Sequence, residues 1–263
     1  MTLPPEILDK ILEHIPLGSQ GPQTLIACTL VATWWTGPSQ RRLFSSVSIY
    51  HRNYQRWMDG VVFSESKAHL LEYVRSLQHW RAVIIGIRYS IRNLSKYSGE
   101  YLSAMHNIYR LVLGNIIIEH ISKGEFRTCF SAFRETLVDL TLDIFNTSFS
   151  ALVALVDYFP NLTTLRLGLF DVTPDEEPVP ALSRPLRGRI HISCISRYLA
   201  GFFDRLAKLD PEYEELILDS GFRMNAELVE RVFRLGASTI RCLRLTAKLE
   251  REHPLRFPLH RTS

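Results

Sequence analysis

The sequence has few cysteines and none of the short motifs that mark common catalytic or metal-binding sites. Its four cysteines are Cys28, Cys129, Cys194 and Cys242, and no two of them form a Cys-x-x-Cys pair. It contains no Gly-x-Ser-x-Gly sequence, no glycine-rich phosphate-binding loop and no His-Glu-x-x-His sequence. We therefore expect buried free thiols, no metal site, no cofactor and no catalytic residues.

Long apolar runs and a strong excess of one charge are also missing. No stretch of about 18 apolar residues could cross a bilayer, and the chain does not open with the basic and apolar segments of a secretory signal. The 31 basic and 27 acidic residues give a net charge of only +4, without a dense lysine or arginine stripe. These features argue against membrane and nucleic-acid partners and predict a soluble protein of the cytoplasm, the nucleus or both.

Apolar residues make up 46% of the 263 residues, and the first 47 residues hold more of them than so short a segment can bury alone. Pro4 and Pro5 fit the first turn of a helix, where a backbone N–H has no partner to lose. The apolar residues that follow repeat at helical spacing: Ile7, Leu8, Ile11, Leu12 and Ile15. We expect a second helix over residues 22–35, a break at Gly37-Pro38, and a short third helix over residues 39–44.

Three blocks within residues 2–47 follow one another in a characteristic order. They are Leu3-Pro4-x-Glu6-Ile7-Leu8-x-x-Ile11-Leu12, then Leu30-Val31-x-x-x-Trp35, then Arg41-Arg42-Leu43-Phe44-Ser45-Ser46-Val47. Their order and spacing resemble the F-box, in the version common in fungal F-box proteins. Ala32 stands where that motif often has cysteine, and Trp34 stands where it usually has a polar residue.

The resemblance implies a partner for the surplus apolar surface. F-box modules bind a Skp-family adaptor, which links them to a cullin-based ubiquitin ligase. The residues that we expect to bind this adaptor are Leu3, Pro4, Pro5, Ile7, Leu8, Ile11, Leu25, Leu30, Val31 and Trp35. The alternative is a helical cap for the next part of the chain, with no partner of its own.

From about residue 105 a short unit recurs, in which aliphatic residues occupy the first, fourth and sixth positions. The final aliphatic residues of its copies are Leu113, Leu142, Leu167, Ile192, Leu218 and Leu245, spaced 25–29 residues apart. Amphipathic stretches separate the copies, over residues 126–133, 152–159, 198–209 and 226–235. One strand and one helix in each such period is typical of leucine-rich repeats. Val74-x-x-Leu77 could begin the series, and Val47 and Ile49 alternate with serine as in a strand.

The sequence therefore predicts an α/β protein: an F-box-like module of three short helices, followed by an irregular leucine-rich-repeat solenoid with a curved parallel sheet. A non-repetitive α/β domain is the alternative. The predicted boundaries are residues 1–47 for the helical module, 48–104 for connecting helices and first irregular repeats, 105–249 for the solenoid, and 250–263 for a basic tail. Residues 173–185, rich in proline and acidic side chains, read as a loop within a repeat.

Side chains alternate along a strand, so the residues between the buried aliphatics should face outward on the sheet. The outward residues that we expect to bind a target protein are Arg110, Asp139, Thr141, Asp143, Arg166, His191, Glu215, Asp219 and Arg244. This face, mixed in charge, suits a protein or peptide partner, or is plain solvated sheet. Together with the F-box resemblance it predicts a non-catalytic adaptor that recruits a target for ubiquitin transfer. The alternative is an interaction scaffold without a ubiquitin role.

Overall fold

The structure is a computed structural model that combines helices with a parallel sheet of eight strands. It describes residues 3–16, 21–50, 53, 56–80, 102–114, 130–143, 145–168, 170–173, 181–193, 199–209, 212–220, 230–231 and 240–247. Its contacts divide the chain into two compact units. The first comprises Met1–Ile116, His120–Leu140 and Phe159–Asn161, and the second comprises Ile117–Glu119, Thr141–Tyr158 and Leu162–Ser263.

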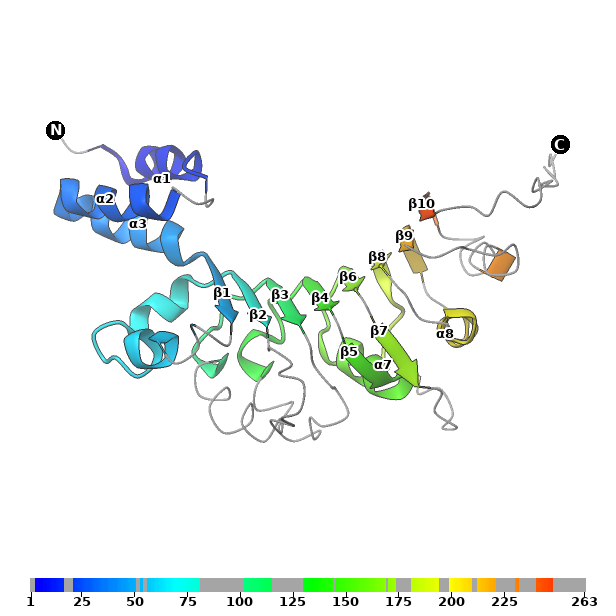
Figure 1. The fold of residues 1–263 in the computed structure, drawn as a ribbon. Helices are drawn as coiled ribbons and strands as arrows, with labels where there is room; N and C mark the ends of the chain where they lie inside the picture. The colour runs from blue at the N-terminus through cyan, green and yellow to red at the C-terminus, as the bar shows by residue number, and fades with distance from the viewer. Residues whose placement is uncertain are drawn as a thin grey trace. The chain divides into compact units, whose positions relative to one another are not determined.

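The first unit opens with three helices, drawn in blue in Figure 1: α1 (Pro5–Glu13), α2 (Gly21–Val31) and α3 (Thr33–Phe44). It continues with β1 (Ser46–Tyr50), the π-helical turn η1 (Met58–Val62), the 3-10 helix η2 (Ala68–Tyr73), β2 (Ser76–Trp80), β3 (Arg110–Gly114) and the 3-10 helix η4 (Ser131–Phe133). Strand β4 (Asp139–Asp143) begins in the first unit and ends in the second.

Helix α1 begins where the two prolines predict. Pro5 occupies its first position, and the carbonyl of Pro4 accepts hydrogen bonds from the N–H groups of Ile7 and Leu8 at 3.0 and 3.2 Å. Neither proline therefore costs a helical hydrogen bond. The core shared by α1, α2 and α3 is small, and its fully buried members are Leu8, Leu12 and Leu25.

The predicted break at Gly37-Pro38 is wrong. Helix α3 runs through both residues, and the break lies at Ala32, whose extended backbone (φ −161°, ψ 152°) separates α2 from α3. A proline inside a helix removes one hydrogen bond and clashes with the carbonyl four residues earlier and with the residue before it. Gly37 has no Cβ, so part of the last clash is absent. The pair is thus tolerated one turn into the helix.

The strands of the first unit pair in parallel and in one register. Val47 lies opposite Leu77, and Leu77 lies opposite Leu111, and all three side chains are buried. This confirms the strand predicted from Val47 and Ile49, and it shows a further strand at Leu77. Hydrogen bonds also connect the start of β4 to the residue before β3. The carbonyl of Tyr109 accepts them from the N–H groups of residues 138 and 139.

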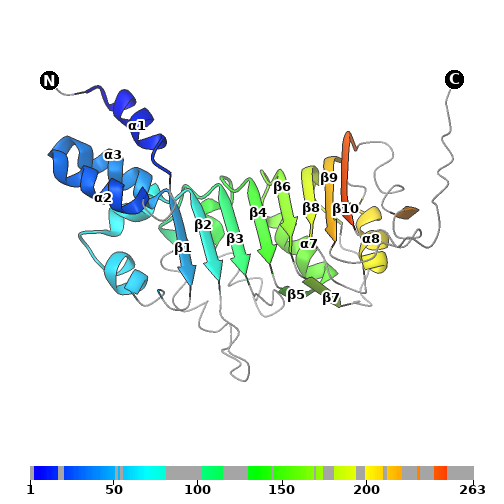
Figure 2. The same cartoon turned by 45° about the horizontal axis from the view of Figure 1, so that its top comes forward.

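The second unit continues the same pattern. Its elements are β5 (Phe145–Ser148), α7 (Phe149–Tyr158), β6 (Thr164–Leu167), β7 (Phe170–Thr173), β8 (Arg187–Ile192), α8 (Leu199–Ala207), β9 (Glu212–Ser220) and β10 (Cys242–Ala247). Strands β6, β8, β9 and β10 are parallel neighbours in that order, side by side in Figure 2. Strands β5 and β7 form a separate two-stranded parallel sheet, which the sequence analysis did not predict.

The repeated aliphatic residues stack in register, as predicted. Leu165 lies opposite Ile190, Ile190 opposite Leu216, and Leu216 opposite Leu243. The final aliphatics are buried in every copy whose side chain the structure describes: Leu113, Leu142, Leu167, Ile192 and Leu218. A period of 25–29 residues therefore places the aliphatic residue of each strand directly beside the corresponding residue of the neighbouring strand.

Helices α7 and α8 lie on the same side of strands β6, β8 and β9 (Figure 1). Their buried aromatic side chains pack against one another: the rings of Phe149 and Phe202 lie 5.6 Å apart and those of Phe202 and Phe203 5.8 Å apart, edge to face. The opposite side of these strands carries the polar residues. Several predicted segments lie outside the described residues. They are the helix over residues 226–235, of which only residues 230–231 are described and helical, most of the proline-rich loop over residues 173–185, and the basic tail over residues 250–263.

Candidate functional site

Two surfaces carry the residues that the sequence analysis singled out, one in each unit. The first, which we call the apolar helix surface, consists of the large exposed hydrophobic residues on and beside α1 and α2: Leu3, Ile7, Ile11, Ile26, Leu30 and Val31. The second, which we call the charged hollow, lies on the polar side of β6, β8, β9 and β10.

Helix α1 is apolar on two sides. Leu8 and Leu12 point into the small core and are 1% exposed, whereas Ile7 and Ile11 are 45% and 42% exposed. Both pairs have the spacing of one helical turn, so each forms a stripe along the helix. A surface helix needs only one apolar stripe to pack on its own core, and the second stripe is left in contact with solvent.

Helix α2 is more exposed still. Leu30 and Val31 at its end are 82% and 68% exposed, and Ile26, one turn earlier than Leu30, is 52% exposed. On the inner side Leu25 is fully buried and Cys28 packs against the core. The sequence analysis chose the neighbouring Leu25 and did not include Ile26, because both lie in one apolar run and the sequence does not show which of them faces the core.

Three of the residues predicted to bind an adaptor are placed differently from the rest. Leu8 and Leu25 are buried in the core of the helices themselves, so they are unavailable to a partner. Trp35 is half-buried, packs against the same core, and its ring lies 5.5 Å from that of Trp34. Leu3, Pro4, Pro5, Ile7, Ile11, Leu30 and Val31 are exposed.

Polar contacts join α3 to α1. The Arg41 guanidinium lies 3.2 Å from the Asp9 carboxylate, and Arg42 donates to the backbone carbonyls of Glu13 and Ile15 at 3.1 and 3.3 Å. The Arg42 contacts satisfy carbonyl groups at the end of α1 that have no helical partner. The basic residues of the third sequence block therefore have a structural role.

In the first unit, two residues predicted to bind a target pair with each other. The Nε of Arg110 lies 3.6 Å from the Oδ2 of Asp139. The arginine side chain is exposed and the aspartate side chain is only 16% exposed. The two charges largely offset one another, so this pair offers a partner little net charge.

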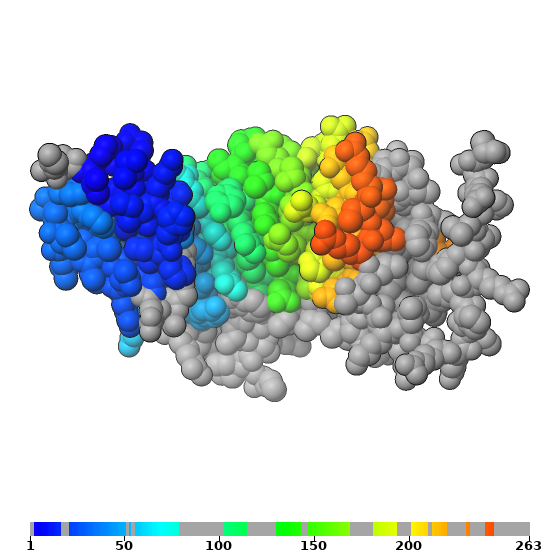
Figure 3. Space-filling view, turned by 90° about the horizontal axis from the view of Figure 1, so that it is seen from above, coloured from blue at the N-terminus to red at the C-terminus, as the bar shows by residue number. Residues whose placement is uncertain are grey.

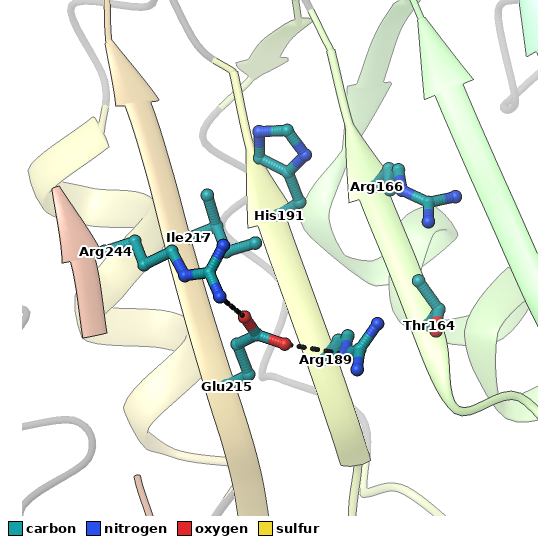
Figure 4. Close-up of a pocket in the computed structure, with 7 residues that line it drawn as sticks. All are labelled: Thr164, Arg166, Arg189, His191, Glu215, Ile217 and Arg244. Carbon is teal, nitrogen blue, oxygen red and sulfur yellow. Dashed lines mark ion pairs between the residues drawn. The ribbon is translucent and has the colours of Figure 1, made fainter. Parts of the chain in front are cut away.

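In the second unit, buried residues alternate with outward ones along β6, the second half of β8 and the middle of β9, and outward residues surround the charged hollow. Arg166, His191, Glu215 and Arg244 were predicted to face outward, and all four line it. Arg189, Thr164 and Ile217 complete the lining (Figure 4). Atoms of β8, β9 and β10, coloured yellow to orange, lie at the surface in Figure 3.

Glu215 is the centre of the charged hollow. Its Oε2 lies 2.6 Å from the Nε of Arg189 on β8, and its Oε1 lies 3.5 Å from the Nη2 of Arg244 on β10 (Figure 4). One carboxylate on β9 therefore pairs with a guanidinium group on each of the two flanking strands. The carboxylate is 15% exposed, while the two arginine side chains are 62% and 68% exposed. A hydrogen bond with the Cys242 side chain, and then the charge of Glu215, raise the pKa of Arg244 above its ordinary value.

The register of β8 with β9 shifts beside a glycine with positive φ. Gly188 has φ +89°, and the pairing of β8 with β9 shifts by one residue between Gly188 and Arg189. A Cβ at Gly188 would lie 2.2 Å from the carbonyl oxygen of Thr163, so no other residue fits without movement. The shift places Arg189 opposite Glu215. Arg189 was not among the residues predicted to bind a target, although alternation with the buried Ile190 already places it outward.

The remaining predicted target-binding residues lie outside the charged hollow. Thr141 and Asp143 are half-buried on β4, and Asp143 lies so close to Gly168 that a Cβ there would meet its Oδ1 at 2.2 Å. Asp219 is exposed on β9, opposite Thr246 of β10. The hollow therefore brings together four of the nine predicted residues: Arg166, His191, Glu215 and Arg244.

Within the described ranges, histidine, cysteine and acidic side chains nowhere gather in threes as a metal site would require. None of the helices in those ranges has the length and apolar character of a membrane span. Cys28 and Cys242 are free thiols but half-buried, which corrects the expectation of burial for these two. Cys129 and Cys194 lie outside the described residues.

The chain was compared with protein-family models and with curated proteins. No family model matches it, and no curated protein matches it.

Proposed function

We propose that this chain is a non-catalytic, substrate-recruiting adaptor of a cullin-based, SCF-type ubiquitin ligase. Helices α1 to α3 form an F-box-like module that binds a Skp-family adaptor. The strands and helices that follow form an irregular leucine-rich-repeat solenoid, whose polar side binds a target protein destined for degradation. The chain contributes proximity, because it raises the effective concentration of the target's lysines near the charged ubiquitin carrier.

One observation supports the proposal: five large apolar residues at positions of the F-box-like motif are exposed, namely Leu3, Ile7, Ile11, Leu30 and Val31. Leu30 and Val31, the central block of the motif, are the two most exposed large hydrophobic residues in the described part of the chain. Burying them is worth about 2 kcal/mol each, and the four half-exposed residues of the apolar helix surface add about 1 kcal/mol each. Together, these burial contributions fall in the lower half of the range of about 4–15 kcal/mol estimated for the free-energy cost of association.

The test is complex formation between the full chain and a recombinant Skp-family adaptor, measured by co-purification and by calorimetry. We expect a complex with the unchanged chain and a loss of at least about 30-fold in affinity for Leu30→Ser combined with Val31→Ser. Phe63→Ser is the matched control, since Phe63 is 52% exposed and lies outside the three helices. Trp35→Ala is a poorer test because Trp35 packs against the core and its removal would unfold the helices.

The proposal fails if the unchanged chain does not bind the adaptor, or if the double variant binds as well as the control while its circular dichroism is unchanged.

A second function, an interaction scaffold without a ubiquitin role, is favoured by the contacts of α3 with the elements after it. The ring of Phe44 lies 6.3 Å from that of Trp57, and the carbonyl of Ser45 accepts hydrogen bonds from the N–H groups of Arg75 and Ser76 at 3.0 and 2.9 Å. In that case the three helices only cap the first strands. The scaffold then binds no Skp-family adaptor, and removal of residues 1–47 unfolds the strands that follow.

A further inference from the structure

Strand β1 lies at one end of the parallel sheet. It is the first strand in the order of the eight-stranded sheet, and among the described strands it pairs with β2 alone (Figure 2). A strand in this position has a second row of backbone N–H and C=O groups that its neighbour does not use, and these groups can pair with a strand of another molecule. Folded proteins therefore protect such edges.

The contacts with β2 show which backbone groups of β1 face outward. The carbonyl of Ser45 accepts hydrogen bonds from the N–H groups of residues 75 and 76 at the start of β2, so it faces β2. Along a strand of a parallel sheet, successive residues direct their backbone groups to opposite sides. Every second residue from Ser45 onward therefore faces β2, and the backbone groups of Ser46, Ser48 and Tyr50 face away from it.

The side chain of Asn53 pairs with two of these outward groups. Its Oδ1 accepts a hydrogen bond from the N–H of Tyr50 at 2.6 Å, and its Nδ2 donates a hydrogen bond to the carbonyl of Ser48 at 2.9 Å. A side-chain amide offers a carbonyl acceptor and N–H donors, as a peptide group does. The Asn53 amide therefore takes the place that a peptide group of a further strand would take beside β1.

The sequence of β1 favours pairing with a further strand. Its five residues read Ser-Val-Ser-Ile-Tyr, with two β-branched residues and one aromatic residue, and without a charge or a proline. Valine, isoleucine and tyrosine are favoured in strands, and short uncharged segments of this kind associate readily when they lie at an edge. Since β1 contains neither lysine nor proline, two common means of protecting an edge are absent from the strand itself.

We propose that the Asn53 side chain closes the outer edge of β1 and thereby prevents this strand from pairing with β1 of a second copy of the chain. Two identical edge strands can pair antiparallel about a twofold axis, because such a contact is self-complementary. The uncharged sequence of β1 places no like charges opposite each other in that arrangement. This role of Asn53 is independent of the adaptor and the target in the proposed function.

The experiment measures self-association of the full chain by sedimentation velocity over a range of concentrations. Asn53→Ala should lower the dissociation constant of self-association at least about tenfold, because it leaves the outward groups of β1 open to a second copy. Asn107→Ala is the matched control. Asn107 is also half-buried and its Nδ2 also donates to a backbone carbonyl, that of Glu72 at 2.9 Å, but it precedes β3 inside the sheet. This variant should stay within about twofold of the unchanged chain.

A lysine on the strand locates the association at β1. Ser46 is exposed at the start of β1, and Ser66 is exposed outside the strand. Combined with Asn53→Ala, Ser46→Lys should return the dissociation constant to within about threefold of the unchanged chain, because a charge on an edge strand opposes pairing. Ser66→Lys adds the same charge away from the edge, so in the same background it should leave the association as it is.

The proposal is overturned if Asn53→Ala associates no more than the unchanged chain, if Asn107→Ala associates as strongly, or if Ser66→Lys reverses the association as well as Ser46→Lys. Should Asn53→Ala lose its circular dichroism signal, Asn53→Ser decides, because serine is polar but too short to bind both backbone groups at once. Hydrogen exchange of the unchanged chain is a separate check: a Tyr50 amide that exchanges as fast as an unpaired amide also overturns the proposal.

Discussion

The three N-terminal helices and the sheet of the second unit use their apolar residues in opposite ways. In the helices, the fully buried core consists of Leu8, Leu12 and Leu25, and the apolar helix surface has six residues, twice as many. In the second unit, aliphatic residues stack from strand to strand beneath an aromatic layer, and the exposed positions are charged or polar.

This difference separates two kinds of docking surface. An apolar surface gains free energy from burial over its whole area, whereas a charged hollow gains mainly orientation and selectivity from a few groups. In the proposed function, the apolar helix surface binds the constant partner and the polar side of the sheet binds the target.

The largest expected effect compares burial in the two regions. Phe203→Ala should lower the free energy of unfolding by about 3–5 kcal/mol, because Phe203 is 1% exposed between α8 and the sheet. Leu30→Ala should change it by less than about 0.5 kcal/mol, because Leu30 is 82% exposed. Urea denaturation followed by circular dichroism measures both. Similar losses in the two variants would break the comparison.

The next effect concerns the bulge that aligns Arg189 with Glu215. Gly188→Ala should cost about 1–3 kcal/mol, because the new Cβ would need a positive φ and would meet a backbone oxygen. Gly201→Ala in α8 is the control, since a Cβ there meets nothing within 4 Å. It should stabilise by about 0.5–1 kcal/mol. Thermal unfolding distinguishes the two signs, and a stabilising Gly188→Ala would contradict the bulge.

A smaller effect appears only at high pH. Burial raises the pKa of Tyr213 well above its ordinary value of 10.0, and its hydroxyl has no hydrogen-bond partner among the described residues. The unfolded chain releases this proton first, so stability should fall as pH rises above 10. Tyr213→Phe should remove that part of the fall and cost less than about 1 kcal/mol at neutral pH. Denaturation curves at a series of pH values test this, and parallel pH profiles for both proteins would refute it.

The smallest effect tests the polar contact between α1 and α3. Asp9→Asn should cost less than about 1 kcal/mol, because both members of the pair with Arg41 are 46% exposed. The loss should shrink further in high salt. Thermal unfolding at two salt concentrations measures it. A larger, salt-independent loss would mean that the helices depend on this pair more than on their small core.

Much of the sheet could be predicted from the sequence, because alternation within a strand and a constant repeat both follow from local geometry. Leu142, Leu167 and Ile192 point inward for that reason, and Arg166 and His191 point outward. The helices were harder to predict. Ile7 and Leu8 are neighbours in one apolar run, and only the position of the other helices decides which of them is buried.

The sequence by itself determined the spacing of the strands, their alternation and the surplus of apolar residues near the start, since these depend on residues that are close in the chain. Tertiary structure alone decided that Leu25 is buried while Leu30 is exposed, and that Arg189 and Arg244 share the carboxylate of Glu215. The physical reason is the same in both cases: burial and charge pairing depend on which distant segments meet, and a shift of one residue between β8 and β9 is enough to change the partners.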